Sequence, residues 1–128
     1  MNSKFAKLSD KEKEVMNVLW HYNESLTASG ITEKSDSLNI NTVQNVLKKL
    51  VNKNYIEVAE IVYSGTVLSR SYRYLVSPEA YAADQLQAMK KTALSFSVMN
   101  FVDYLSQDDS DEILAELEEA IKQKREDE

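Results

Sequence analysis

Residues 39–50 read NINTVQNVLKKL and carry polar side chains of the types that contact DNA bases. At helical spacing the apolar residues of this segment share one face, namely Val43, Val46, Leu47 and Leu50. The other face carries amides, a threonine and two lysines but no acid: Asn41, Thr42, Gln44, Asn45, Lys48 and Lys49. Asn and Gln pair with adenine in the major groove, Lys contacts guanine or phosphate, and a carboxylate would repel the DNA backbone. The segment is therefore a candidate DNA-reading helix, although an ordinary solvated helix face explains its composition equally well.

Two further helices are expected before this segment. Periodicity predicts helices over residues 10–22, 28–34 and 40–52. Ser9 and Glu12 have the spacing of a capping box at the start of the first helix. Thr27 and Asn39 are expected to cap the second and third helices through their side-chain oxygens. Asn39 is also a candidate DNA contact, as are Thr27 and Ser29, whose hydroxyls could donate to a phosphate, although capping alone accounts for Thr27.

Residues 55–76 are rich in Val, Ile, Tyr and Thr and have a Ser-Gly pair in the middle, which predicts a two-stranded hairpin. Three short helices followed by a hairpin are the element order of a winged helix-turn-helix. In that fold the third helix reads the major groove and the hairpin is the wing. Arg70 and Arg73 would then hold phosphate or enter the minor groove, the alternative being that both are ordinary surface arginines.

The two halves of the chain differ in charge. Residues 1–76 hold ten Lys or Arg against eight acids, whereas the whole chain has a formal charge of -6, so the remainder is strongly acidic. Pro78, the only proline, lies close to this change. We therefore expect a DNA-binding domain over residues 1–76 and a helical dimerisation region over residues 77–128.

Apolar residues of the C-terminal region recur at helical spacing over residues 93–105 and again in a final helix. They offer more apolar surface than one short helical pair can bury, so a second copy of the chain is the expected partner. The predicted dimerisation residues are Leu94, Val98, Phe101, Val102, Leu105, Ile113, Leu114, Leu117 and Ile121. The expected fold is mostly α with a small β-hairpin wing, that is, a winged helix-turn-helix followed by a helical dimerisation region.

Composition argues against several other classes of function. The chain has no cysteine and a single histidine, His21, so disulfides, cysteine nucleophiles and metal sites are not expected. With two glycines there is no Gly-rich phosphate loop, and His21 has no visible triad partner, so we expect neither an enzyme nor a cofactor. No segment approaches the roughly 18 apolar residues of a spanning helix, which predicts a cytoplasmic protein with no membrane partner.

Three segments of the chain match a known pattern: LSDKEKEVMNVLW (8–20), NTVQNVLKKLVNKNYI (41–56) and SVMNFVDYLSQDDSDEILAEL (97–117). They resemble the opening helix, the recognition helix and the C-terminal region of the penicillinase and methicillin-resistance repressors (the BlaI/MecI type). That family also includes copper-responsive repressors. The resemblance implies a homodimeric repressor whose winged helices bind the two halves of a palindromic operator in double-stranded DNA. The cysteine metal motif of the copper-responsive members is absent here.

In the β-lactam-responsive members a sensor-protease system leads to a cut between Asn and Phe, which corresponds to Asn100 and Phe101 in this chain. The resemblance makes this pair a candidate cleavage site, whose cutting would remove dimerisation and with it the cooperative binding of two half-sites. The alternative is that Phe101 only packs in the apolar stripe. The family commonly has Lys or Arg where Asn41 and Gln44 stand, which implies a different operator and a weaker salt dependence.

Two other hypotheses stay open. A winged helix can respond to a small ligand without proteolysis, and the aromatic residues that could line such a pocket are Tyr63, Tyr72, Tyr74, Tyr81, Phe96 and Phe101. A winged helix can also serve as a protein-interaction module that binds no DNA, which suits the net acidity. A ligand-induced melting shift would support the first hypothesis, and an absence of DNA binding at low salt would support the second.

Overall fold

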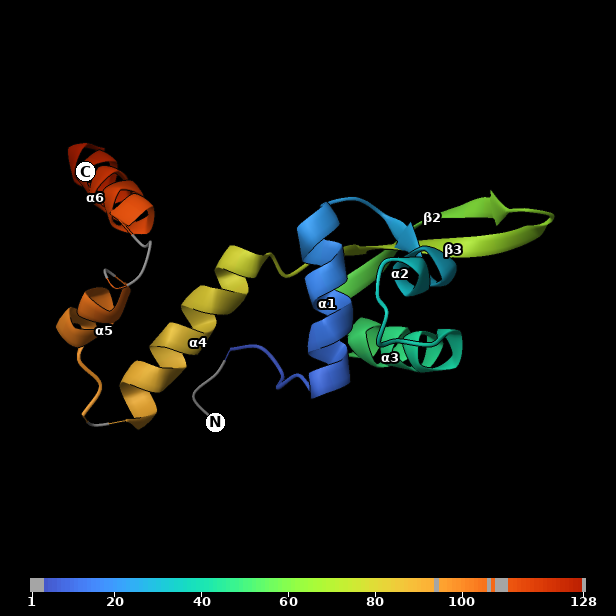
Figure 1. Ribbon diagram of the computed structural model, residues 1–128, viewed down its shortest axis with the longest axis horizontal. Coiled ribbons are helices and arrows are strands. Elements are labelled where there is room, and N and C mark those ends of the chain that lie inside the picture. The colour runs from blue at the N-terminus through green and yellow to red at the C-terminus, as the bar shows by residue number, and fades with distance from the viewer. Residues whose placement is uncertain (1–3, 94, 106, 108–110, 128) are drawn as a thin grey trace. The chain divides into compact units, whose positions relative to one another are not determined.

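The computed structural model describes residues 4–93, 95–105, 107 and 111–127, and it divides into two compact units, Met1–Gln87 and Ala88–Glu128. The first unit holds α1 (Asp10–Tyr22), β1 (Leu26–Thr27), α2 (Ala28–Glu33), α3 (Ile40–Asn52), β2 (Ile56–Ser64), β3 (Val67–Tyr74) and the first turns of α4 (Pro78–Thr92) (Figure 1). The second unit holds the end of α4, α5 (Val98–Leu105) and α6 (Asp111–Glu126). The expected fold, mostly helical with a winged helix first and helices after it, is confirmed.

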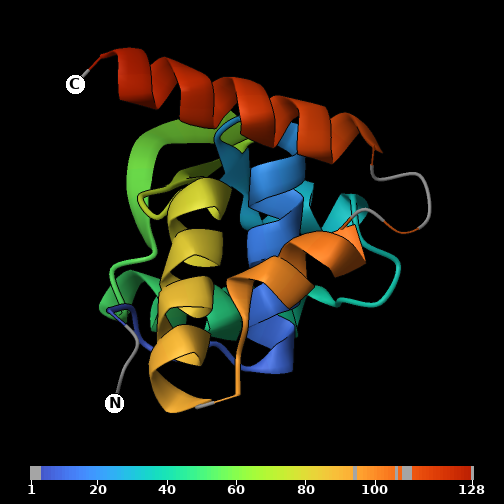
Figure 2. The same cartoon turned by 90° about the vertical axis from the view of Figure 1, so that its left-hand side faces the viewer.

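The first unit extends past the boundary that the sequence suggests at residue 76. Ser77 Oγ accepts a hydrogen bond from the Ala80 N–H at 3.0 Å, and Ala80 and Tyr81 pack against the core. The Trp20 ring lies 5.4 Å from that of Tyr81, and its Nε1 donates to the Val76 carbonyl at 2.9 Å. Figure 2 shows the start of α4 beside α1. These turns therefore belong to the N-terminal unit by packing, while a functional division at residue 76 stays a prediction.

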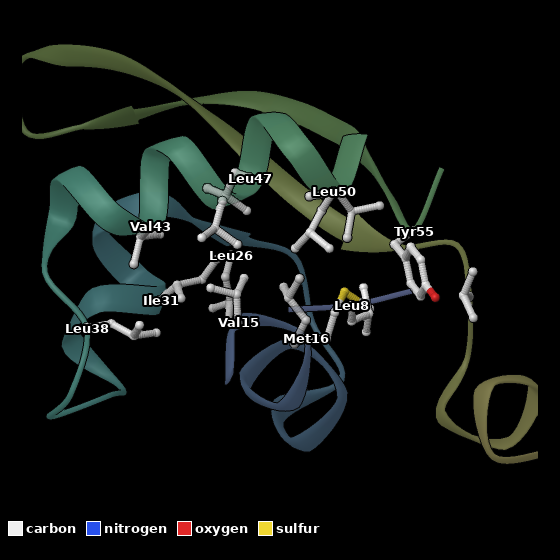
Figure 3. Close-up of a cluster of buried hydrophobic side chains, with 14 residues drawn as sticks. Leu8, Val15, Met16, Leu26, Ile31, Leu38, Val43, Leu47, Leu50 and Tyr55 are labelled. Atoms are coloured by element: carbon white, nitrogen blue, oxygen red, sulfur yellow. The ribbon is translucent and has the colours of Figure 1, made fainter. Parts of the chain in front are cut away.

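The core of the first unit lies between α3 on one side and α1, β1 and α2 on the other (Figure 3). It is built mainly from Val15, Met16 and Leu19 of α1, Leu26 of β1, Ile31 of α2, Tyr55, and Val43, Val46, Leu47 and Leu50 of α3. Each of the four α3 residues is at most 5% exposed, which confirms the predicted stripe. Full burial of an aliphatic side chain contributes about 1.5–3 kcal/mol, so this stripe is a large share of what holds α3 in place.

The predicted helix caps are confirmed. Ser9 Oγ accepts from the Glu12 N–H at 3.3 Å, and Glu12 Oε1 accepts from the Ser9 N–H at 2.7 Å, which completes a capping box. Thr27 and Asn39 each accept from the backbone N–H three residues on, at 3.0 and 2.9 Å. Asn54, two residues after α3, has a left-handed φ of +63° and turns the chain toward β2.

The sheet has three strands in the order β1-β3-β2, where the sequence predicts only a two-stranded hairpin. β1 pairs antiparallel with β3, with Leu26 opposite Tyr72 and Thr27 opposite Ser71. A strand of two residues is too short to show the alternation that marks strands in a sequence, so β1 could not be found that way. Because β1 leads directly into α2, its pairing with β3 holds the wing beside α2.

The apolar segment over residues 93–105 is not one helix, so that prediction is wrong. α5 begins only at Val98, and the described residues 95–97 before it are turn or irregular structure. Ser97 Oγ accepts from the backbone N–H three residues on at 3.2 Å, as the cap of a new helix does. Leu94 lies outside the described residues. The spacing of apolar residues alone does not show where a capping serine begins a new helix within an apolar segment.

The segment before α1 is held against the middle of α4 and the turn that follows α3. The N–H groups of Lys4 and Phe5 donate to the Asp84 carboxylate at 2.6 and 3.3 Å. The Tyr55 hydroxyl donates to the Ala6 carbonyl. Burial, with nearby negative charge, raises the pKa of Tyr55 to about 12, so this hydroxyl keeps its proton and its hydrogen bond at physiological pH.

A buried ion pair joins α1 to the residue that follows α3. Glu12 Oε1 lies 2.7 Å from Lys53 Nζ, which also donates to the Lys7 carbonyl at 2.7 Å. The Glu12 side chain is 2% exposed and that of Lys53 31%. Burial alone would raise the pKa of Glu12, but hydrogen bonds from Lys53 and from the Ser9 N–H, together with the Lys53 charge, lower it overall. Folding therefore favours the ionised carboxylate.

We expect Glu12→Gln to lower the free energy of unfolding at neutral pH by about 2 kcal/mol, because glutamine keeps the shape and the acceptor oxygen but replaces charge-assisted hydrogen bonds from Lys53 and the Ser9 N–H with weaker neutral ones. Since the folded-state pKa of Glu12 lies below its ordinary value of 4.5, the stabilisation is present above that value and is lost as pH falls through the folded-state pKa. Urea unfolding from neutral to acidic pH measures this, and the two proteins should converge in acid. A difference that stayed constant with pH would contradict the assignment.

Candidate nucleic-acid interface

The face of α3 opposite the core is polar and exposed. Its exposed members are Asn41, Gln44, Asn45, Lys48 and Lys49, with Thr42 half-buried beside them. Burial of the apolar stripe produces this arrangement, because a helix that turns one side inward turns the intervening residues outward. No residue of α3 is acidic, so its polar side chains offer amide, hydroxyl and ammonium groups alone.

A hollow of about 370 Å³ lies where α3 meets the start of α2 and the wing. Ser29 of α2, Gln44 and Lys48 of α3, and Arg70 of β3 all line it. These four residues are predicted DNA contacts, and the fold brings them together from three separate elements. Two of them are cations and none of the described lining residues is acidic, so the hollow favours an anionic ligand.

The pairing of β1 with β3 places Arg70 in this hollow. Thr27, the last residue of β1, lies opposite Ser71, and Arg70 is the residue immediately before Ser71 in β3. α2 begins immediately after Thr27, so Ser29 is carried to the same place. Ser71 is buried, and its hydroxyl donates to the Glu60 carbonyl of β2 at 3.2 Å, which ties all three strands together at this level.

Three of the predicted contacts already have partners within the protein. Thr27 and Asn39 use their side-chain oxygens as helix caps, and the hydroxyl proton and the amide NH₂ can still donate. Arg73 Nε lies 2.6 Å from Glu57 Oε2 across the β2–β3 pair. It borders a separate small hollow next to the loop after α1, whereas Arg70 faces α3. The two arginines that look alike in the sequence therefore have different surroundings.

Leu68 and Tyr72 of β3 also line the larger hollow, and the sequence does not single them out as DNA contacts. They share the strand face of Arg70, because residues two apart in a strand point to the same side. This alternation is visible in the sequence once Arg70 is assigned to a strand.

The second unit leaves much of its predicted dimerisation stripe uncovered. Its exposed members are Val98, Phe101, Ile113, Leu117 and Ile121, and its half-buried members are Val102, Leu105 and Leu114. No residue of α5 is buried, although six of its eight residues are apolar or aromatic. Apolar surface gathered on adjoining helices in this way is typical of a protein interface.

The Asn100–Phe101 pair lies in the first turn of α5. Both residues are exposed, and the Phe101 ring centre lies 5.9 Å from that of Phe96. The N–H groups of Asn100 and Phe101 donate to the Ser97 hydroxyl and carbonyl oxygens at 3.2 and 3.0 Å. The peptide bond that joins the pair is thus at the surface but in helical conformation.

The aromatic residues of the ligand-pocket hypothesis lie in several places. Tyr63 is at the tip of the wing and is 76% exposed. Tyr74 donates to the C-cap asparagine of α1 at 2.7 Å, and Tyr81 packs on α1. Phe96 and Phe101 contact each other in the second unit. These positions do not single out a shared cavity.

Metal binding and membrane insertion find no support in the described part of the chain. There, no group of three His, Cys, Asp or Glu side chains is suitably placed to hold a metal ion. None of the helices within residues 4–93, 95–105 and 111–127 is both long enough and apolar enough to span a membrane.

Comparison with known proteins yields a family match. The family model described as "Penicillinase repressor" matches residues 8–123. No curated protein matches the chain significantly. The matched range includes the polar face of α3, the wing and nearly all of the second unit, so it covers both parts of the molecule described above.

Proposed function

We propose, since this chain belongs to the penicillinase repressor family, that it represses transcription as a homodimer bound to a palindromic operator. Members of the family are regulatory repressors rather than enzymes, so the chain is of the transcriptional-repressor kind. The observation that carries the DNA-binding part is the convergence of Ser29, Gln44, Lys48 and Arg70 on one hollow without acids. A ligand that meets all four must offer both anionic and hydrogen-bonding groups, as a DNA groove does.

In this proposal α3 lies in the major groove. Gln44, with Asn41 and Asn45 on the same exposed face, hydrogen-bonds to base edges, where amides suit adenine. Lys48 contacts guanine or phosphate, and Arg70 holds a phosphate beside the groove. Attraction to DNA is then a local property of this face, since the chain as a whole carries a formal charge of -6.

We expect the double variant Gln44→Ala/Lys48→Ala to bind operator DNA at least roughly tenfold more weakly, because each good base contact contributes about 1–3 kcal/mol. Fluorescence anisotropy measures the change in affinity at two salt concentrations. The probe is a duplex from upstream of the gene that encodes this protein, and a scrambled duplex of equal length is the comparison. The matched control is Lys13→Ala/Asn17→Ala, which removes a lysine and an amide from the exposed face of α1. Unchanged binding by the first variant, in a protein with normal melting, would remove α3 from the interface.

The homodimer rests on the uncovered stripe of α5 and α6. Helices that expose this much apolar surface gain stability when a second copy covers it. Two linked winged helices bind two half-sites more tightly than either binds alone, because the second half-site is met at a high effective concentration. In this proposal the dimerisation residues therefore control repression although they do not contact DNA.

Phe101→Asp/Leu117→Asp is expected to yield a monomer, since each change places a charge in the stripe. Light scattering after gel filtration measures the mass. Binding to the full palindrome should fall, while binding to a single half-site should not change. Ala115→Asp, on the exposed opposite face of α6, serves as the control and should remain a dimer. A double variant that stayed dimeric would place the interface elsewhere.

Release of the operator is proposed to follow a cut between Asn100 and Phe101. The bond is exposed, and the helix that contains it has eight residues with none buried, so local opening has a low free-energy cost. The cut separates most of the predicted dimerisation residues from the winged helix. The dimer would then fall apart although the DNA-reading face stays intact.

Phe101→Leu tests the cleavage site against a purely packing role, because leucine keeps the apolar contact but removes the Asn-Phe pair. In host cells exposed to a β-lactam, we expect the wild type to yield a fragment that ends at Asn100, identified by mass spectrometry. The variant should stay intact and keep its target gene repressed, whereas Phe96→Leu should be cut normally. Derepression with an intact wild-type chain would exclude proteolytic release.

A further inference from the structure

Residues 4–8, which precede α1, form a strap that is fixed to the first unit although it contains neither helix nor strand. Leu8 is buried in the core. The Ala6 carbonyl accepts a hydrogen bond from the Tyr55 hydroxyl, and the Phe5 ring centre lies 6.1 Å from that of Tyr55. Figure 1 shows the strap, in dark blue, running from α1 toward α4. The strap is therefore a packed part of the unit.

The strap meets α4 at Asp84. The backbone N–H groups of Lys4 and Phe5 donate to its two carboxylate oxygens at 2.6 and 3.3 Å. Asp84 is 5% exposed and is the one buried residue of α4, every residue of which the structure describes. A buried carboxylate needs donors that replace water, and hydrogen bonds to a charged group are about twice as strong as neutral ones. This pair of bonds thus favours one position of α4 against the strap.

α4 is held at a second point close to the first. The Tyr81 ring centre lies 5.4 Å from that of Trp20, and residues three apart share a helix face, so Tyr81 and Asp84 hold the same side of α4. A helix that is held at two points about one turn apart has a defined direction, whereas one held at a single point can swing. Asp84 therefore fixes the direction in which α4 leaves the winged helix.

That direction matters because α4 connects the two units. Asp84 lies close to Gln87, where the first unit ends, and α4 continues as one helix to Thr92 in the second unit. A helical connection acts as a semi-rigid spacer, in contrast to a flexible linker. The hold that the strap has on α4 is thus passed along the helix toward the predicted dimerisation residues.

We infer that the contact between Asp84 and the strap determines which spacing of two operator half-sites the dimer accepts. The inference rests on the proposed function, in which each copy reads one half-site and the C-terminal helices pair. A stiff connection presents the second α3 at one distance and at one rotation around the duplex, whose turn is about 10–10.5 base pairs. Asp84 is then a residue that determines specificity, although it is buried within the first unit.

Loosening this contact has a different signature from losing a DNA contact. Binding to a single half-site depends on the DNA-reading face of one copy, so it should not change. Binding to two half-sites depends on the effective concentration of the second winged helix, which is high where a stiff connection matches the spacing and low where it does not. A loose connection lowers the first value and raises the second. The preference for the native spacing therefore shrinks while each half-site is still read.

The test uses two strap variants of the full chain, Asp84→Ala and Lys4→Pro. Proline has no N–H, so Lys4→Pro removes the 2.6 Å hydrogen bond without changing α4, and it decides the test if Asp84→Ala does not fold. Lys4→Ala keeps that N–H and is the matched control. Glu79→Ala removes an exposed acid from α4 and is the control for Asp84→Ala. Thermal melting establishes which variants are folded.

Fluorescence anisotropy is measured with the duplex from upstream of the gene that encodes this protein, after footprinting has mapped its half-sites. The comparison duplexes are a single half-site and a version with about five base pairs inserted between the half-sites, which turns one of them to the opposite side of the duplex. The wild type and both controls should bind the native spacing roughly a hundredfold more tightly than the altered one. The strap variants should reduce this preference roughly tenfold and bind the single half-site as the wild type does.

Spin labels measure the same loosening without DNA. The chain has no cysteine, so Lys13→Cys, on the exposed face of α1, adds one label to each copy of the dimer. Double electron–electron resonance should give a narrow distribution of distances between the two labels in the otherwise wild-type dimer. The distribution should be broader in the strap variants, because α4 then leaves each winged helix in a range of directions.

An unchanged spacing preference in the folded strap variants would overturn the inference and leave the proposed function intact. Equal weakening on the single half-site and on the full duplex would also overturn it, since the strap would then only support the DNA-reading face. If the wild type binds none of the duplexes, or is a monomer, the proposed function fails and the inference fails with it.

Discussion

Val43, Val46, Leu47 and Leu50 pack one side of α3 into the core with α1 and α2, and this packing determines which residues of α3 reach solvent. Successive residues of a helix are about 100° apart, so rotating α3 by one position would bury an amide or a lysine in place of an aliphatic side chain. A buried amide without a partner costs about 1–3 kcal/mol. The apolar packing thus holds Gln44 and Lys48 outward, and no contact of their own is needed to do so.

The wing depends on a second constraint, the pairing of β3 with both neighbouring strands. Through β1, β3 is tied to the start of α2, and through β2 it carries the exposed tip. The same register that brings Arg70 to α3 turns the carboxylates of Glu57 and Glu60 to the opposite side. A chain with a net negative charge can therefore present an acid-free surface, because strand alternation separates its charges more finely than overall composition suggests.

The parts of the fold that depend on local chemistry could be predicted from the sequence. Ser9, Thr27 and Asn39 accept hydrogen bonds from backbone N–H groups three residues away, so the sequence correctly predicts the helix starts that they mark. β1 has no such local signal and exists only because β3 lies beside it. Likewise, Arg70 and Arg73 lie on opposite faces of β3, and only Arg73 has Glu57 as its neighbour. This difference depends on the strand register, which the residue types do not show. In the apolar run, α4 ends at Thr92 and α5 begins at Val98 with Ser97 as its cap, a break that the helical spacing of the apolar residues does not reveal.

The two described non-glycine residues with left-handed backbone conformation are both asparagines, Asn23 after α1 and Asn54 after α3. Such a conformation is accessible to glycine and, at modest cost, to asparagine, but is strained for most other residues. The exposed residues of α3 have no comparable restriction, because neither the core nor the turns depend on them. The exposed side chains of α3, which we propose contact DNA, can therefore be exchanged one at a time while these two turns stay nearly fixed. If α3 reads DNA as proposed, substitutions on its exposed face can change the preferred DNA sequence without unfolding the domain.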